Sequence, residues 1–119
     1  MAGAITRGDV RLVHFAHFAA PDKNRARIGW GVVLTRNSAI GYRATVTVAP
    51  VTSTIRGVPS EVVLDTEDGM KAPCAVNLHH AVTISQEKLG RRVAKLDAAR
   101  MAEICAALAF SLGCGPEGH

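Results

Sequence analysis

The chain has 119 residues and a formal net charge of +4 at pH 7, with a pI near 9.3. This length fits one domain, residues 1–119, that folds without disulfides, and its three cysteines form no CxxC pair, so we expect a reduced, cytoplasmic protein. No stretch approaches the roughly 20 apolar residues that span a bilayer, and the first residues lack the apolar segment of a signal peptide, which argues against a membrane-spanning or exported protein.

The first part of the chain predicts β-strands joined by polar loops. Asp9–Phe18 begins with alternating apolar and polar residues and continues apolar, which predicts a strand. Ala19–Gly29 is rich in cations and has no apolar period, which predicts a long surface loop. Asn37 and Ser38 are expected to form a turn, and Pro50 indicates an edge strand or a bulge. The remaining strands are predicted at Trp30–Asn37, Tyr42–Val51, Ser60–Asp65, Cys74–Ile84 and Gly90–Leu96.

The last part of the chain changes to a helical period. Asp97 is a suitable N-cap, and Gly113 and Gly115 are the residues that commonly end a helix. The apolar residues at helical spacing are Met101, Ile104, Cys105, Leu108 and Leu112. Strands followed by one terminal helix predict a small antiparallel barrel or curved sheet with a helix packed on it.

The cationic residues gather in two segments. Lys23, Arg25 and Arg27 lie in the predicted long loop, and a second group lies near Lys88–Lys95. One interpretation is a solvated face that keeps the protein soluble. The other is a polyanion partner, since Lys and Arg that neutralise phosphates supply most of the affinity for nucleic acids. Aromatic residues make up only 4% of the chain, so extensive base stacking is not expected.

Three consecutive hydroxyl residues occupy a bend within "TVTVAPVTSTIRGVPSEVVL", residues 45–64. Thr52, Ser53 and Thr54 are followed by Arg56 and Gly57. A hairpin needs only a turn former, so hydroxyl donors beside a guanidinium suggest a bound anion. The alternative is structural, because threonine hydroxyls also cap turns and an arginine can be merely solvated.

Several segments together resemble the MazF/PemK family of bacterial toxins, from about Arg7 to Gly113. They are "RGDV" from Arg7, "VVLTRN", "VAPVTSTIRGVPSEVVL", "CAVNL" and "RRVAKLDAARMAEICAALAFSLG". The resemblance implies a mainly β fold, a small SH3-like antiparallel barrel of the CcdB/PemK/MazF type with a C-terminal α-helix. It also implies a homodimer, a metal-independent endoribonuclease that cuts single-stranded RNA at short sequences, and a cognate antitoxin that blocks the RNA groove.

The resemblance also suggests roles for particular residues. Family cleavage uses the RNA's own 2′-hydroxyl, so the protein must supply proton transfer and donors for the charge on phosphorus. Thr52 matches the threonine that is expected to hydrogen-bond the reacting phosphate, which makes the bend a candidate phosphate cradle. The residues expected to bind RNA are Lys23, Arg25, Ser53, Thr54, Arg56 and Asn77.

This chain departs from the family pattern at two places. Gly29 and Trp30 occupy the place where the family has an arginine followed by a proline, so we expect Arg27 to stabilise the phosphorane, with Arg25 as the reserve. Relatives carry an acidic residue where this chain has His79, which could transfer protons or contact a base edge. If Cys74–Ile84 is one strand, Asn77 and His79 share a face and His80 points away from it. The alternative is that neither histidine has a role.

Other chemistries have little support in the sequence. No HxH, HExxH or Cys/His cluster predicts a metal, and no cofactor is expected. No nucleophile elbow is present. The remaining functional alternative is a catalytically impaired relative of the family that acts as an RNA-binding or gyrase-poison-like module, which the missing arginine favours.

Overall fold

The structure is a computed structural model that describes residues 4–15 and 27–114. Within these residues, seven strands form one antiparallel sheet. Their bounds are β1 (Asp9–Phe15), β2 (Arg27–Val33), β3 (Thr45–Thr52), β4 (Glu61–Leu64), β5 (Cys74–Asn77), β6 (Val82–Ser85) and β7 (Leu89–Lys95). The helices are α1 (Asn37–Ile40), the 3-10 turns η1 (Thr66–Asp68), η2 (Leu78–His80) and η3 (Gln86–Lys88), and the terminal α2 (Ala98–Leu112).

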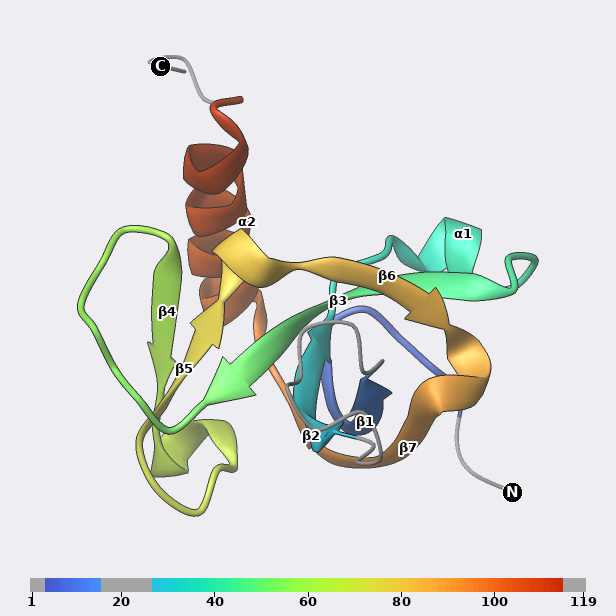
Figure 1. Ribbon diagram of the computed structural model, residues 1–119, viewed down its shortest axis with the longest axis horizontal. Helices are drawn as coiled ribbons and strands as arrows, with labels where there is room; N and C mark the ends of the chain where they lie inside the picture. Colours follow the sequence, from blue (N-terminus) through green and yellow to red (C-terminus); the bar gives the residue numbers. More distant parts are fainter. Residues whose placement is uncertain (1–3, 16–26, 115–119) are drawn as a thin grey trace.

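The strands follow the order β4-β5-β3-β2-β1-β7, and β6 also pairs with β3. Figure 1 shows β3 crossing the middle of the molecule, with β4 and β5 on one side and β1, β2 and β7 curving around the other. The sheet is open, with β4 and β7 as the ends of this path. The predicted fold class, a mainly β antiparallel structure with a C-terminal helix, is confirmed.

The core lies between the curved sheet and α2. Val32 of β2, Val76 of β5 and Leu78 of η2 pack in one buried cluster with Ile104 of α2. A second cluster, which includes Val46 and Val48, lies under the other half of β3. Burial of these side chains stabilises the fold by roughly 1.5–3 kcal/mol for each aliphatic residue. The helix and the strands that carry polar residues toward solvent are thereby fixed relative to one another.

Helix α2 begins and ends where the sequence predicts. The Asp97 side chain accepts a hydrogen bond from the backbone N–H of Arg100, and Gly113 closes the helix with a φ of +70°. Ile104 is fully buried, but Cys105 and Leu112 of the predicted apolar stripe are exposed. The helix therefore uses one narrow stripe for the core and leaves the remaining apolar residues at the surface.

The segment Cys74–Ile84 is not one strand, and that prediction is wrong. The Asn77 side chain accepts a hydrogen bond from the backbone N–H of His79 and caps the turn η2, which separates β5 from β6. The two strands pair with different halves of β3. Apolar residues flank the turn on both sides and Leu78 within it is buried, so the polar residues Asn77, His79 and His80 are compatible with one half-exposed strand.

Pro50 does not mark an edge strand, since β3 is paired on both sides. Pairing with β6 ends at Val48 and pairing with β5 begins at Val51, so Pro50 lies in the gap between them. A proline has no N–H to donate, and at this gap it interrupts neither ladder. Other boundaries differ as well. Residues 27–29 belong to β2 rather than to the predicted loop, β3 begins at Thr45 rather than Tyr42, and Asn37 and Ser38 begin the one-turn helix α1.

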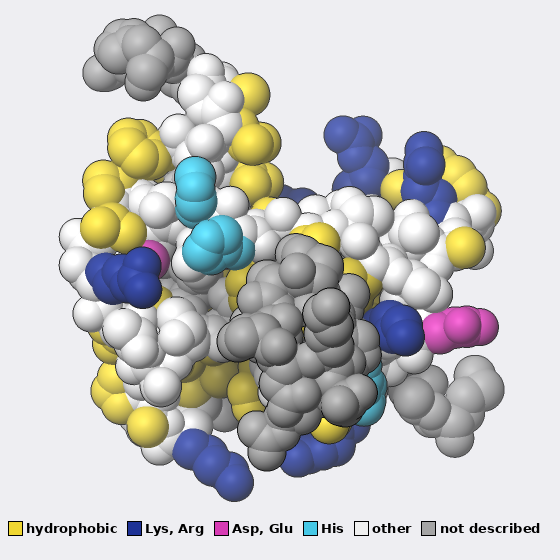
Figure 2. Space-filling model, in the orientation of Figure 1, with side chains coloured by type: hydrophobic (Ala, Val, Ile, Leu, Met, Phe, Trp, Pro, Cys, Tyr) yellow, Lys and Arg dark blue, Asp and Glu magenta, His cyan; other side chains and the backbone are white. Residues whose placement is uncertain are grey.

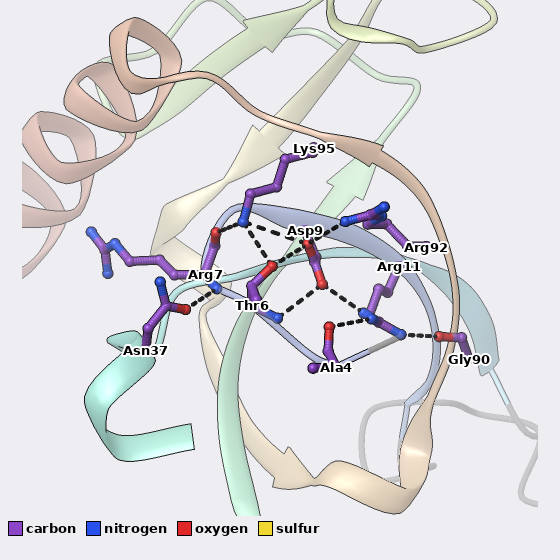
Figure 3. A network of polar contacts seen from close by, with 9 residues as sticks. All are labelled: Ala4, Thr6, Arg7, Asp9, Arg11, Asn37, Gly90, Arg92 and Lys95. Atoms are coloured by element: carbon purple, nitrogen blue, oxygen red, sulfur yellow. Dashed lines mark hydrogen bonds and ion pairs between the residues drawn. The ribbon is translucent and has the colours of Figure 1, made fainter. Parts of the chain in front are cut away.

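Asp9 is fully buried in β1 at the centre of an ion-pair network that the sequence did not predict (Figure 3). It accepts hydrogen bonds from the backbone N–H and hydroxyl of Thr6, at 3.0 and 2.8 Å, and pairs with Arg11 Nε at 2.9 Å. Arg92 and Lys95 of β7 lie 3.7 and 3.6 Å away. Burial raises the pKa of Asp9, but the hydrogen bonds from Thr6 and Arg11 outweigh it and hold that pKa below its ordinary value.

Among the described residues, none of the helices combines the length and the apolar character needed to cross a membrane.

Candidate active site

An open cleft of about 880 Å³ lies where the end of β3 meets β5 and η2. The bend after β3 contributes Thr52, Ser53, Thr54 and Arg56 to its wall. The β5 side of the cleft contains Glu61, Asn77, His79 and His80, and Gly29 borders the cleft from β2, on the other side of β3. The structure therefore brings the predicted hydroxyl bend and the predicted Asn77–His79 segment to one place.

Thr52 is the last residue of β3, and its hydroxyl both shapes the bend and borders the cleft. Its Oγ1 accepts a hydrogen bond from the backbone N–H of Thr54 at 3.1 Å. A hydroxyl that accepts through a lone pair still has its hydrogen to donate. Thr52 therefore caps the turn, as the structural alternative predicted, and its hydroxyl hydrogen remains available to a ligand.

Glu61, at the start of β4, holds the loop that follows the bend. Its Oε1 accepts hydrogen bonds from the backbone N–H groups of Arg56 and Gly57, both at 3.0 Å. Gly57 has a φ of +71°, which suits glycine. Sequence reasoning missed Glu61, because its role depends on a contact across a loop rather than on a motif.

His79 and His80 both line the cleft, so the prediction that His80 points away from it is wrong. They belong to η2 and not to a strand, so the two-residue alternation does not apply to them. Asn77 Oδ1 accepts from the His79 backbone N–H at 3.1 Å, and Asn77 Nδ2 lies 2.8 Å from His80 Nδ1. The ring centroids are 5.4 Å apart. Figure 2 shows histidine side chains side by side on this face.

The other predicted site residues are placed only in part. Lys23 and Arg25 lie outside the described residues. Arg27 begins β2, where its backbone pairs with Phe15, but its side chain is not among those described. Trp30 pairs with Val51, which puts Gly29 level with Thr52 across the sheet. Gly29, which stands where the family pattern has an arginine, therefore lies next to Thr52.

The arrangement combines hydroxyl donors, one guanidinium and two imidazoles in an exposed cleft. Such a set suits an anionic ligand whose charge increases during a reaction, because donors and proton carriers surround one place. Glu61 is the carboxylate in the described wall, and one of its oxygens already holds backbone N–H groups. Across residues 4–15 and 27–114, no three His, Cys, Asp or Glu side chains gather closely enough to hold a metal ion.

Comparison with known proteins gives the same picture over nearly the whole chain. Residues 6–112 match the family model described as "PemK-like, MazF-like toxin of type II toxin-antitoxin system". The chain is 42% identical over 84 residues to probable endoribonuclease MazF5 of Mycobacterium tuberculosis, covering 70% of this chain and 77% of the relative. It is 35% identical over 98 residues to endoribonuclease MazF3 of the same organism, covering 81% and 91%.

Solved structures of similar fold include a toxin and an endoribonuclease. The M. tuberculosis toxin MazF-mt6 has a TM-score of 0.73 and 26% identity, covering 87% of this chain and 94% of that chain. A mycobacterial endoribonuclease solved with its cognate antitoxin has a TM-score of 0.77 and 24% identity, covering 94% and 98%. At 24% identity, the similarity to the endoribonuclease structure is one of fold.

Proposed function

Because the chain belongs to the family of PemK-like, MazF-like toxins of type II toxin–antitoxin systems, we propose that it is an endoribonuclease that cuts single-stranded RNA. The observation that supports this most directly is the cleft in which the Thr52 hydroxyl, Arg56 and two histidines converge. These residue types match what the cleavage of a phosphodiester demands. Among the described residues the cleft is open on one side, which suits a strand of RNA.

The reaction that we propose uses the substrate's own nucleophile. The 2′-oxygen of a ribose attacks the adjacent phosphorus, and the bond from phosphorus to the 5′-oxygen of the next nucleotide breaks. One proton leaves the 2′-hydroxyl and one joins the departing 5′-oxygen, so the products are a 2′,3′-cyclic phosphate and a 5′-hydroxyl. Protein groups must therefore accept a proton, donate a proton and stabilise the added charge on the phosphoryl oxygens.

The described residues divide these tasks. Thr52 donates its hydroxyl hydrogen to the phosphoryl oxygen, and Ser53 and Thr54 hold neighbouring oxygens. Arg56 offsets the charge of the RNA backbone. His79 transfers protons, since imidazole is the side chain that changes charge near neutral pH. We also assign Arg27 to the phosphorane, and Lys23 and Arg25 to the RNA backbone.

We extend the proposal to the partners of this chain. Phe110 and Leu112, near the end of α2, are 60% and 67% exposed, which leaves apolar surface for a second copy in a homodimer. A cognate antitoxin would act by covering the cleft that contains Thr52. The site of action would be the cytoplasm, where the RNA is.

The decisive experiment is to incubate the purified protein with a long unstructured RNA in the presence of EDTA. We expect fragments with common end sequences, 2′,3′-cyclic phosphates and 5′-hydroxyls. Thr52→Ala should slow cleavage by about 10²-fold or more, as the loss of one donor to a developing oxyanion does elsewhere. Thr52→Ser keeps the hydroxyl and is the matched control. RNA that stays intact would refute the endoribonuclease, and equal activity in Thr52→Ala would refute the role of Thr52.

Two single variants test the other assignments. Arg27→Ala should reduce the cleavage rate strongly, and the Arg27 role is wrong if that variant matches the parent while Thr52→Ala is inactive.

His79→Ala should change the shape of the pH–rate profile near neutrality. A profile that only moves down, with an unchanged shape, would remove the proton-transfer role of His79.

A second candidate function follows from Gly29. Because it lies level with Thr52, the place where relatives have an arginine carries no side chain here. A protein of this kind could bind RNA without cutting it. Binding of the same RNA with no new ends after long incubation would favour this candidate over the nuclease.

A further inference from the structure

We propose that His80 is a fixed hydrogen-bond donor that reads a keto base beside the scissile phosphate, and that Asn77 fixes it in this form. The proposal rests on the proposed function, since it assigns specificity at the same cleft. His80 would thus determine which RNA sequence is cut, whereas His79 would serve the reaction itself. Four steps connect the contacts to this conclusion.

The first step is the orientation of the Asn77 side-chain amide. A backbone N–H can only donate, so the atom of Asn77 that meets the His79 N–H at 3.1 Å is the oxygen Oδ1. The amide nitrogen Nδ2 must then be the atom that faces His80. The contact with the His79 backbone N–H therefore fixes the orientation of the Asn77 amide.

The second step is the tautomer of His80. Asn77 Nδ2 can only donate, so His80 Nδ1, 2.8 Å away, must accept and carries no hydrogen. A neutral imidazole that lacks hydrogen on Nδ1 carries it on Nε2, at the other side of the ring. His80 therefore presents an N–H donor. No described side chain forms a hydrogen bond to the ring of His79, so its tautomer is not fixed in this way.

The third step is the distance from the reacting group. Thr52 pairs with Ala75, and Asn77 follows two residues later along β5. At a rise of roughly 3.3 Å per strand residue, Asn77 lies about 7 Å along the strand from the level of Thr52. His80 lines the same cleft from η2, beyond Asn77. It is thus placed for a neighbouring nucleotide rather than for the phosphate at Thr52.

The fourth step is the chemistry of the ligand. Phosphates in RNA complexes are held mainly by charged or backbone donors, whereas sequence is read at base edges. Guanine and uracil present a carbonyl oxygen at the position where adenine and cytosine present an amino group. A fixed N–H donor donates a hydrogen bond to the carbonyl oxygen, whereas the amino group offers it no acceptor. His80 therefore favours a keto base at its position.

The tautomer can be tested without RNA. Nitrogen-15 NMR of the histidine rings at about pH 9, well above the ordinary imidazole pKa of about 6.5, should show His80 with bare Nδ1 and protonated Nε2. Asn77→Asp replaces the donor by an acceptor and should reverse the tautomer. His80 with protonated Nδ1 in the parent, or no reversal in Asn77→Asp, would overturn the proposal. This measurement is independent of whether the protein cuts RNA.

The specificity is tested by cleavage of a randomised RNA pool. The parent should prefer G or U over A and C at one position near the cut by roughly tenfold, the value of one hydrogen bond. His80→Ala should lose this preference, and His80→Gln, which retains a terminal N–H, should keep part of it. Asn77→Asp should shift the preference toward A and C. His14→Ala, at an exposed histidine of β1, is the control and should cut as the parent does.

Two outcomes would contradict the specificity role. If His80→Ala slowed cleavage equally at all sequences, His80 would contact the backbone and not a base. If the base preference of the parent survived in both His80→Ala and Asn77→Asp, another residue would read that position. A parent with the expected tautomer that cuts no RNA would instead refute the proposed function and leave the tautomer assignment intact.

Discussion

Glu61 shows how a single side chain can shape a site without contacting a substrate. One of its carboxylate oxygens holds the backbone N–H groups of Arg56 and Gly57, and Arg56 is the cation that lies beside Thr52 in the cleft. The loop between β3 and β4 is largely exposed, so few other contacts restrain it. Its order depends on this carboxylate more than on burial.

We therefore expect Glu61→Ala and Glu61→Gln to differ. Glutamine keeps an oxygen that accepts both hydrogen bonds, so Glu61→Gln should retain the parent KM for RNA. Alanine removes the acceptor, which costs about 1 kcal/mol and frees the loop, so KM should rise roughly fivefold. Steady-state cleavage of a short RNA measures both variants. Equal KM values for the two variants would show that the hydrogen bonds do not position Arg56.

Local motifs were sufficient to predict one wall of the cleft. Thr52, Ser53, Thr54 and Arg56 are adjacent in the chain, so any bend there brings them together. Glu61 and His80 were missed because their roles come from hydrogen bonds that depend on the turn η2 and on the loop before β4. Only the Asn77 side chain, a common cap, gave a signal that the chain could turn there.

At the scale of elements, Arg100 joins helix α2 to the turn η1. Its Nε contacts both carboxylate oxygens of Asp68, at 3.0 and 3.1 Å, and its Nη1 reaches Glu103. Burial raises the pKa of Asp68, but the hydrogen bonds from Arg100 and Asp65, together with the charge of Arg100, outweigh it and hold that pKa below its usual range. The pair lies where the strand β4 leads into the turn beneath the helix.

Arg100→Lys should destabilise the protein although it keeps the charge. Lysine is a point charge and cannot reproduce the fork of donors, so we expect a loss of about 1 kcal/mol in the free energy of unfolding. Urea denaturation measures it. Arg36→Lys, at an exposed arginine before α1, is the control and should change stability little. Equal losses in both variants would mean that the Asp68 contact contributes nothing specific.

The elements themselves were predicted with uneven success, and the reason is physical. Helix α2 and most strands follow from hydrophobic period and from caps at Asp97 and Gly113, which are local signals. The division of Cys74–Ile84 into β5 and β6 was missed, because apolar residues of both strands and the buried Leu78 between them continue across the turn. Which half of β3 each strand pairs with is a property of the folded sheet, and no residue pattern within one segment encodes it.

At the scale of the whole molecule, the Asp9 network fastens the N-terminal segment and β1 to β7. The pKa of the Asp9 carboxyl is lower in the folded protein than in the unfolded chain. The unfolded chain therefore binds a proton more readily, and the stabilisation is present above the unfolded value near pH 4. It is lost as the pH falls through the lower folded value.

Asp9→Asn should weaken the fold and flatten its acid dependence. Removing the carboxylate takes away the negative charge that Arg11 Nε contacts at 2.9 Å inside the protein, which should cost about 3–5 kcal/mol at pH 7. Urea unfolding from pH 7 down to about pH 3 should show a smaller decline in stability for the variant than for the parent. Glu87→Gln, at an exposed carboxylate, should leave the pH dependence as it is. Parallel curves for parent and Asp9→Asn would contradict this account.

The break at Pro50 affects how this fold can diversify. Because β3 changes partner there, β5 and β6 diverge along it. The cleft lies at this divergence and is bordered by strand residues as well as by the loop after β3. Both β5 and β6 form hydrogen bonds with β3, so moving them apart to widen the cleft would break inter-strand hydrogen bonds. A change of target sequence should therefore come more readily from exchanging the side chains that line the cleft than from reshaping the backbone around it.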